Sequence, residues 1–148
     1  MAIQTNTLFW QFVLKVHPDY SNYMGIVFEK VCTDYLREKN AKGELPFLFT
    51  SIGRWWGTNP VTRNQVEIDI VANDNKDFLL GECKWKNEKL DITILRQLKE
   101  KADIFHKNRE NTWYVLFSKS GFTEAIIEEA EKDKNILLVD VNKLMEIS

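Results

Sequence analysis

The chain has 148 residues, a length that suits one domain with a single hydrophobic core. Hydrophobic residues make up 44% of it and charged residues 28%, which are ordinary values for a globular protein. The formal net charge of −2 excludes a basic field over the whole protein, so any nucleic-acid binding has to depend on a local patch.

The composition also excludes several other classes of protein. No stretch approaches the roughly 20 apolar residues that a membrane helix needs, and the start lacks the basic residues of a signal peptide. The two cysteines, Cys32 and Cys83, have no partner at the spacing of a zinc site. We therefore expect a cytoplasmic protein in a reducing compartment, without membrane contact.

The chain begins with an apolar segment. Residues 1–20 include the run LFWQFVL and end at the turn His17-Pro18-Asp19. We expect this segment to be the remnant of an upstream region, and residues 21–148 to form the domain proper.

The first half of that domain changes from a helical to a strand period. Residues 21–39 predict an amphipathic helix, because apolar residues recur at helical spacing and Asn40 to Gly43 stop it. Three strands follow at 46–57, 65–72 and 77–85, with a bulge at Gly53 and a hairpin turn at 73–76.

The second half alternates helices with buried strands. The pattern predicts a helix at 91–108, a strand at 112–118, a helix at 122–133, a strand at 136–140 and a last short helix. The order from residue 21 to the last strand is α-β-β-β-α-β-α-β. A meander that runs into a βαβ crossover gives an α/β fold with a mixed sheet flanked by helices.

Charged residues lie inside the predicted hairpin 65–85. Strand side chains alternate between faces, so Glu67 and Asp69 point the same way, and Glu82 and Lys84 share a face of the next strand. The same alternation turns the apolar residues of the first strand to its other face, namely Val66, Ile68 and Ile70.

This set of residues suits metal-assisted hydrolysis of a phosphodiester. Mg²⁺ and Mn²⁺ take oxygen ligands, and carboxylates on rigid strands supply them. A lysine beside the metal orients water and stabilises negative charge on a phosphate. Glu29 lies close to the apolar stripe of the first helix and can add a ligand. The alternative is that the carboxylates only form the solvated face of a strand.

The arrangement resembles the PD-(D/E)XK nuclease superfamily, which has the restriction-endonuclease-like fold. That pattern has an acid on the first helix, an Asp on the second core strand and Glu-x-Lys on the third, which correspond here to Glu29, Asp69, Glu82 and Lys84. Ile68 stands where the pattern has Pro.

The resemblance implies a role for each of these residues. Asp69, Glu82 and Glu29 would bind Mg²⁺ or Mn²⁺ together with the backbone carbonyl of Cys83, and Lys84 would position water and stabilise the phosphorane. Glu67 and Gln97 would support the metal or orient water; some members of the superfamily place a Gln on the helix that here carries Gln97.

A closer resemblance covers nearly the whole chain. The segments YMGIVFEKVCTDYL, IGRWWG, EIDIVA, LLGECKW, YVLFSKSGFTE and ILLVDV are similar to the C-terminal domain of archaeal-type, DEXX-box AAA-like ATPases. In that family the domain follows a P-loop ATPase, and this chain has no GxxxxGK segment followed by Ser or Thr. The resemblance implies an ATPase domain as a partner, in cis or in trans.

A second group of residues can contact nucleic acid. Arginine binds phosphate and an exposed indole stacks on a base, but at least one tryptophan is expected in the core. The basic residues of segment 84–101, among them Lys99 and Lys101, form either a phosphate-binding rim or a solvated helix face. The candidate contacts are Arg54, Trp55, Trp56, Lys86 and Arg96.

We therefore expect a Mg²⁺- or Mn²⁺-dependent DNA endonuclease domain. One alternative is a catalytically silent module of the same fold that binds DNA or a partner protein. Another is a homodimeric resolvase of branched DNA, which has the same fold and a similar acid on its first helix.

Overall fold

The structure is a computed structural model and describes residues 21–106 and 111–146. Its elements are α2 (Ser21–Ala41), β1 (Ser51–Thr58), β2 (Gln65–Asn73), β3 (Phe78–Lys84), α3 (Ile92–Phe105), β4 (Thr112–Ser118), α4 (Glu124–Lys132), β5 (Ile136–Asp140) and α5 (Val141–Met145). This order confirms the predicted one. The predicted apolar segment 1–20 lies outside the described residues.

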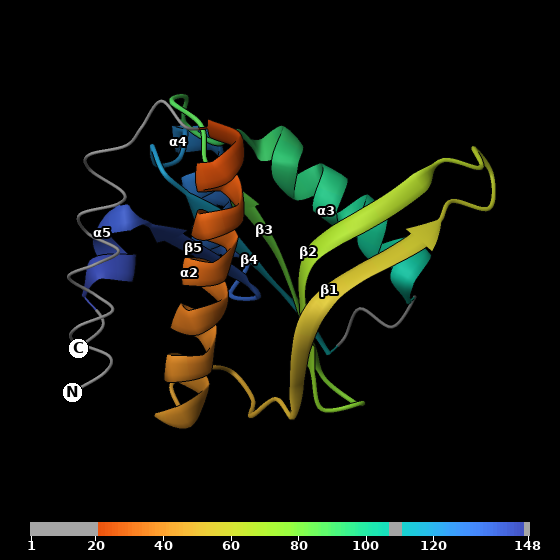
Figure 1. Cartoon of the computed structure of the whole chain (residues 1–148), viewed down its shortest axis with the longest axis horizontal. Helices are drawn as coiled ribbons and strands as arrows, with labels where there is room; N and C mark the ends of the chain where they lie inside the picture. Colours follow the sequence, from red (N-terminus) through yellow and green to blue (C-terminus); the bar gives the residue numbers. More distant parts are fainter. Residues whose placement is uncertain (1–20, 107–110, 147–148) are drawn as a thin grey trace.

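All five strands form one sheet in the order β1-β2-β3-β4-β5 (Figure 1). The pairs β1–β2 and β2–β3 are antiparallel, and β3–β4 and β4–β5 are parallel. The parallel pairs are joined through α3 and α4, as parallel strands need crossover connections. The predicted restriction-endonuclease-like fold, a mixed sheet flanked by helices, is confirmed.

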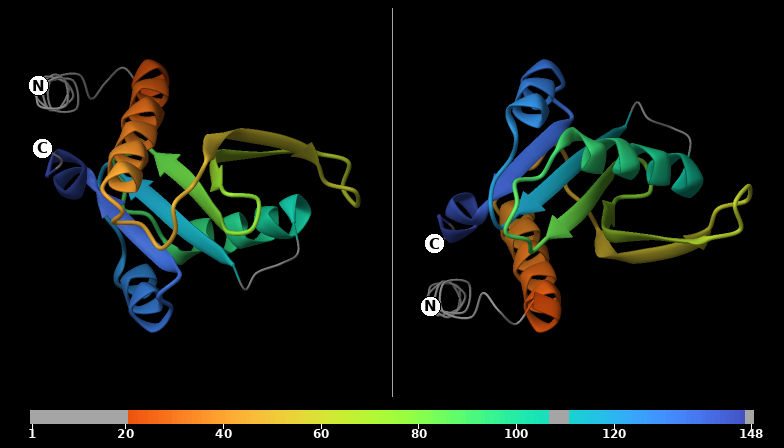
Figure 2. Two further views of the ribbon diagram at one scale, coloured as in Figure 1. Left: turned by 90° about the horizontal axis from the view of Figure 1, so that it is seen from below. Right: turned by 90° about the horizontal axis from the view of Figure 1, so that it is seen from above.

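The helices cover the two faces of the sheet (Figure 2). Met24, Phe28 and Leu36 of α2 are buried in one apolar cluster that also includes Leu144 of α5. Leu95 and Leu98 of α3 are buried in a second cluster on the opposite face, together with a residue of α4. None of the helices within residues 21–106 and 111–146 is long and apolar enough to cross a membrane.

The predicted strand 46–57 begins only at Ser51. The side chain of Asn40 at the end of α2 accepts a hydrogen bond from the Phe49 N–H at 3.0 Å and donates one to the Phe49 carbonyl at 3.1 Å. These bonds occupy the polar backbone groups of Phe49 that a neighbouring strand would otherwise satisfy. The prediction of strand for residues 46–50 is therefore wrong.

The sheet divides at the middle of β2. The β2–β3 pairing ends with Ile70 opposite Gly81, whereas β1 and β2 stay paired as far as Thr58 and Gln65. Beyond that point the β1–β2 pair projects from the body as a curved arm (Figures 1 and 2). The unpaired edge of β3 faces the gap that this separation leaves.

A bulge lies at the same place, next to Gly53 as predicted. Gly53 pairs with Val71, but Trp55 pairs with Ile68, so Asp69 and Ile70 together oppose a single residue of β1. The extra residue is on β2 and breaks its alternation of faces. Ile68 therefore packs in the cluster under α3 and Ile70 in the cluster under α2, so the prediction that they share a face is wrong.

Gly81 allows β3 to pack closely against side chains of both neighbouring strands, β2 and β4, beside this gap. A Cβ at Gly81 would lie 2.9 Å from Cγ1 of Val115 and 3.2 Å from Cβ of Ile70. Because neither neighbour is the end of a flexible side chain, we expect Gly81→Ala to lower the free energy of unfolding by about 1–3 kcal/mol, measured by urea denaturation.

Gly53→Ala is the matched control, because a Cβ at Gly53 would meet nothing within 4 Å. We expect this variant to change the free energy of unfolding by no more than about 0.5 kcal/mol. Equal losses of unfolding free energy in the two variants would show that the close contacts of Gly81 do not cause the destabilisation.

Candidate functional site

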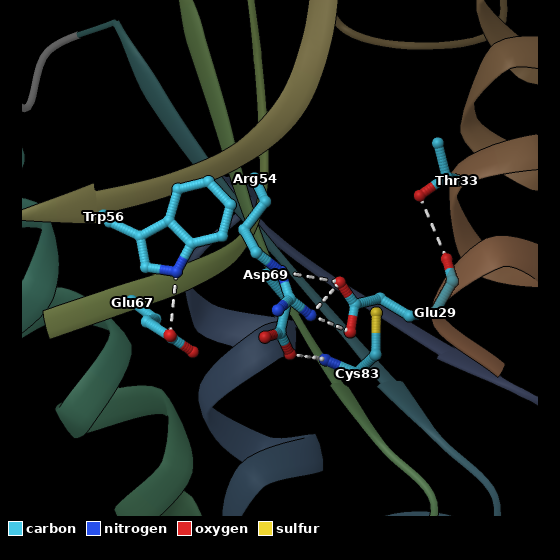
Figure 3. Close-up of polar contacts among 7 residues, drawn as sticks. All are labelled: Glu29, Thr33, Arg54, Trp56, Glu67, Asp69 and Cys83. Carbon is cyan, nitrogen blue, oxygen red and sulfur yellow. Dashed lines mark hydrogen bonds and ion pairs between the residues drawn. The ribbon is translucent and has the colours of Figure 1, made fainter. Parts of the chain in front are cut away.

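Asp69 lies at the fork where β2 leaves β3. Its Oδ2 atom accepts a hydrogen bond of 3.0 Å from the backbone N–H of Cys83 on β3 (Figure 3). If the ladder continued, this N–H would point at the backbone of β2, so the carboxylate takes the place of a strand partner. Asp69 is thus anchored to the edge of β3 by its own side chain.

Glu82, the residue before Cys83, is buried with only 3% of its surface exposed. Burial raises the pKa of Glu82 from 4.5 to about 7, and the nearby Asp69 carboxyl adds to the increase through its charge and a hydrogen bond. The opposing influence is Lys101 of α3, whose Nζ lies 2.7 Å from Oε1 of Glu82. The half-buried Asp69 and the buried Glu82 therefore form a pair of interacting carboxyls.

Glu29 extends from α2 toward the same place. Its two carboxylate oxygens both contact the guanidinium of Arg54, which comes from β1 (Figure 3). Burial raises the pKa of Glu29; the hydrogen bond from Arg54 opposes this, and the charges of Asp69 and Glu67 add to it. Glu29 is therefore close enough to Asp69 for their charges to interact, but it also forms an ion pair with Arg54.

Lys84 and the Cys83 carbonyl complete the predicted set on β3. Lys84 is half-buried and follows Glu82 by two residues, so the pleat turns both to one face of the strand. The N–H and C=O of one strand residue point to the same edge. Because the Cys83 N–H reaches Asp69 across the gap, its carbonyl also faces the gap.

Glu67 and Gln97 lie farther from the carboxyl pair. Glu67 is on the arm and accepts a hydrogen bond of 2.8 Å from the indole N–H of Trp56. Gln97 is exposed on α3. Both line a groove of about 500 Å³ between the arm and α3, together with Lys101. The groove reaches Lys101, which is paired with Glu82, so Glu67 and Gln97 lie beside the site. Within residues 21–106 and 111–146, neither side chain is hydrogen-bonded to Asp69 or Glu82.

The candidate nucleic-acid contacts separate into two groups. Trp56 is 54% exposed, and the Arg54 guanidinium lies 5.9 Å from its ring. Trp55 instead packs edge-on against Phe105 of α3, at 5.2 Å between ring centroids. The expectation that at least one tryptophan packs in the core is confirmed by Trp55, which lies against the cluster under α3.

Lys86 and Arg96 are exposed but are not gathered at the carboxylates. Lys86 lies in the loop after β3, where its carbonyl accepts a hydrogen bond from Ser120. Arg96 lines a separate hollow between α3 and α4, beside Lys99 and Glu129. Arg96 therefore lies on a different surface from Arg54 and Trp56.

Two partners were missed by sequence reasoning. Lys101 appears in the sequence only as one of several lysines in a basic segment, yet it is the ion-pair partner of Glu82. The sequence contains one indication of this: Lys101 precedes Ala102, the last buried position of α3, and so lies at the margin of the buried stripe. Nothing in the sequence indicates that Arg54 pairs with Glu29.

The donor atoms at the fork suit a hard divalent cation. Asp69 and Glu82 offer two carboxylates and Cys83 a carbonyl, which are the oxygen ligands that Mg²⁺ and Mn²⁺ prefer. In the part of the chain that the structure describes, no group of three His, Cys, Asp or Glu side chains is arranged to hold a metal. The third carboxylate, Glu29, is engaged by Arg54. The set that fits is thus two side chains and one carbonyl.

The chain is a mixed α/β domain in which a pair of interacting carboxyls lies where two strands of the sheet separate. Residues 3–104 match the family DUF234, described as archaea bacterial proteins of unknown function, and the chain belongs to this family. A 109-residue region is 38% identical to the uncharacterized protein MJECL04 of Methanocaldococcus jannaschii and covers 71% of this chain. The match spans only 24% of the length of that relative.

Three solved structures resemble this chain. AF1548, a protein of unknown function, aligns with a TM-score of 0.50 at 13% identity over 79% of this chain and 64% of that one, a likeness in fold. A repair endonuclease from Pyrococcus abyssi aligns with a TM-score of 0.46 at 17% identity, over 76% of this chain and 46% of that one. AspBHI, a DNA modification-dependent restriction endonuclease, aligns with a TM-score of 0.46 at 15% identity, over 91% and 33%.

The raised pKa of Glu82 predicts a pH dependence of stability. A carboxyl whose pKa is higher in the folded state binds more protons there, so its contribution to stability falls as the pH rises from about 4.5 to about 7. Relative to Glu82→Gln, we expect the wild type to lose about 3 kcal/mol of unfolding free energy across this range in the presence of EDTA. Urea denaturation at several pH values measures it.

Glu128→Gln on the exposed face of α4 is the control, and it should keep the pH profile of the wild type. A Glu82→Gln profile parallel to that of the wild type would contradict the assignment of the titration to Glu82.

Lys101→Met tests the ion pair from the other side. Without the ammonium, the Glu82 carboxyl keeps its burial and its like-charged neighbour, so its pKa should rise above about 7. The measurement is an NMR titration of the ¹³C-labelled side-chain carboxyls. Lys89→Met, in the exposed loop before α3, should leave this titration unchanged. An unaltered Glu82 titration in Lys101→Met would mean that the ion pair does not form in solution.

Proposed function

We propose that this domain is a Mg²⁺- or Mn²⁺-dependent DNA endonuclease that hydrolyses phosphodiester bonds. The observation that carries the proposal is the carboxyl pair Asp69–Glu82, held together at the gap between β2 and β3. Placing the buried Glu82 beside a second carboxyl costs stability. A group with so perturbed a pKa as that of Glu82 is typical of functional sites, and a bound cation removes the repulsion between the two acids.

Asp69, Glu82 and the Cys83 carbonyl would hold the cation, and Glu29 would join them after leaving Arg54. A bound divalent cation supplies Lewis-acid stabilisation of the negative charge that develops on the phosphate. The remaining roles belong to side chains. Lys84, on the face of Glu82, donates hydrogen bonds to the attacking water and to a phosphate oxygen. Lys101 holds Glu82 in place through its ion pair.

The surface around the site supports DNA as the substrate. Arg54 and Trp56 lie together on the arm and offer a cation and an exposed indole next to the carboxylates. These are groups that contact phosphate and stack on a base. Glu67, whose carboxylate is bonded to Trp56, and Gln97 of α3 both line the groove between the arm and α3, where they would orient water beside a bound strand.

We further propose that the domain works with an ATPase, in cis or in trans, as the C-terminal domain of the archaeal-type ATPases that its sequence resembles. The length of the relative from Methanocaldococcus jannaschii supports a larger assembly, because the aligned region spans only 24% of it. An ATPase would supply the DNA or the opened strand on which the nuclease acts.

One observation favours a second function, that of a catalytically silent module binding DNA or a partner protein. Glu29 and Glu82 each already have a cation, Arg54 and Lys101 respectively. In this alternative both ion pairs are structural, and neither carboxylate is available to a metal.

Metal binding separates the two functions. We expect the wild type to bind Mn²⁺ in isothermal titration calorimetry, and Asp69→Asn and Glu82→Gln to bind it at least about 10-fold more weakly, because each removes an anionic oxygen ligand. The same two variants should not nick supercoiled plasmid. Lys84→Met should retain Mn²⁺ binding and lose nicking, since it removes a hydrogen-bond donor and no ligand.

Glu128→Gln should match the wild type in both assays. Absence of Mn²⁺ binding by the wild type would refute the nuclease proposal and leave the silent module. Binding without nicking, on plasmid and on single-stranded DNA alike, would point to the ATPase as a required partner.

A further inference from the structure

Arg54 occupies an unusual position for an arginine. It is the residue of β1 that opposes the bulge formed by Asp69 and Ile70. Its guanidinium contacts both oxygens of Glu29 and lies within electrostatic reach of Asp69 and Glu67 (Figure 3). A cation of the protein itself therefore lies among three carboxylates of the candidate site.

This contact makes Glu29 a weaker ligand for a metal. Arg54 uses Nε and Nη2 to hold Oε1, and Nη2 also contacts Oε2, so both carboxylate oxygens are occupied. Oε2 keeps a second lone pair, but the guanidinium neutralises the charge of Glu29 and fixes its position, so Arg54 competes with a metal for this carboxylate. In the structure the carboxyl pair of Asp69 and Glu82 is therefore one acid short of the predicted ligand set.

The same guanidinium is accessible from outside. The side chain of Arg54 is 36% exposed, and it shares one face of the arm with Trp56. Trp56 is oriented by the hydrogen bond from its indole N–H to Glu67. The planar guanidinium binds phosphate through the same paired hydrogen bonds that it makes with a carboxylate. A DNA phosphate reaching this face can thus replace Glu29 on Arg54.

We propose that Arg54 is a positioning residue that exchanges Glu29 for a phosphate of the DNA substrate, and that the released Glu29 then joins Asp69 and Glu82 at the metal. This inference rests on the proposed nuclease function and adds the order of events. Without DNA, Arg54 holds Glu29 and weakens metal binding. With DNA, the phosphate neutralises Arg54 and the complete acidic set forms.

The exchange makes DNA and metal bind cooperatively. Each ligand favours the arrangement in which Glu29 has left Arg54, so each must strengthen the binding of the other by the same factor. A purely structural ion pair predicts that any coupling between DNA and metal is the same with and without Arg54. It also predicts that loss of Arg54 weakens the fold, and with it the binding of any metal.

The test is Mn²⁺ calorimetry on the wild type and Arg54→Gln, with and without a DNA duplex whose phosphorothioate linkages resist hydrolysis. Without DNA, we expect Arg54→Gln to bind Mn²⁺ at least about fivefold more tightly than the wild type, because Glu29 is released. Adding the duplex should tighten Mn²⁺ binding by the wild type to a similar extent. It should tighten Mn²⁺ binding by the variant by a smaller factor, because only the contact of the cation with the DNA phosphate remains.

Two variants complete the design. Glu29→Gln should gain less from the duplex than the wild type does, because the released group is no longer an anion. Arg37→Gln removes an exposed arginine farther along α2 and should behave as the wild type. Duplex binding in EDTA, followed by fluorescence anisotropy, should weaken in Arg54→Gln with a salt dependence reduced by about one ion.

The outcomes distinguish this inference from the proposed function. If the wild type binds Mn²⁺ and Arg54→Gln binds it equally or more weakly, the exchange is wrong and the nuclease proposal stands. If the wild type shows no gain from the duplex, the exchange is also wrong. If the wild type does not bind Mn²⁺ at all, with or without the duplex, the nuclease proposal fails and the exchange fails with it.

Discussion

The site depends on one missing stretch of backbone pairing. The β2–β3 ladder stops at Ile70 and Gly81, and the next outward N–H of β3, that of Cys83, is satisfied by the Asp69 carboxylate. A buried N–H without a partner is costly, so this bond lets the strands separate without an unsatisfied donor. The separation creates the gap and lets the β1–β2 arm project from the body of the sheet. It also places Asp69 of β2 next to Glu82 of β3.

The electrostatics of the gap follow from its burial. Acids at this depth repel one another and lose hydration, which raises the pKa values of Glu82 and Glu29. Each acid is stabilised by a cation from a different element, Lys101 of α3 or Arg54 of β1. The two faces of the sheet thus contribute separately, α3 through Lys101 and α2 through Glu29. A ligand that changes either ion pair changes the charge of the whole cluster.

Sequence patterns alone predict most of the fold. Helical spacing identifies α2 and α3, and continuous apolar runs identify β4 and β5, because these patterns reflect burial of one face or of both. The hairpin follows from two strands and a turn. Within it, pairing and alternation place Asp69 near Glu82 and put Glu82 and Lys84 on one face. The core of the candidate site is therefore a local property of residues 65–85.

The tertiary structure decided the rest. Residues 46–50 have the pattern of a strand, but the Asn40 side chain forms hydrogen bonds with both backbone groups of Phe49. In β2 the side chains stop alternating at the bulge, so Ile70 lies on the opposite face from the predicted one. The sequence alone determined which residues lie on which helix or strand, and that Asp69 and Glu82 come from neighbouring strands. Which cation meets which acid was settled only by tertiary contacts, since Arg54 and Glu29 lie 25 positions apart, and Lys101 and Glu82 lie 19 apart. Local periodicity contains no information about such distant pairs, because they form only when helices and strands pack together.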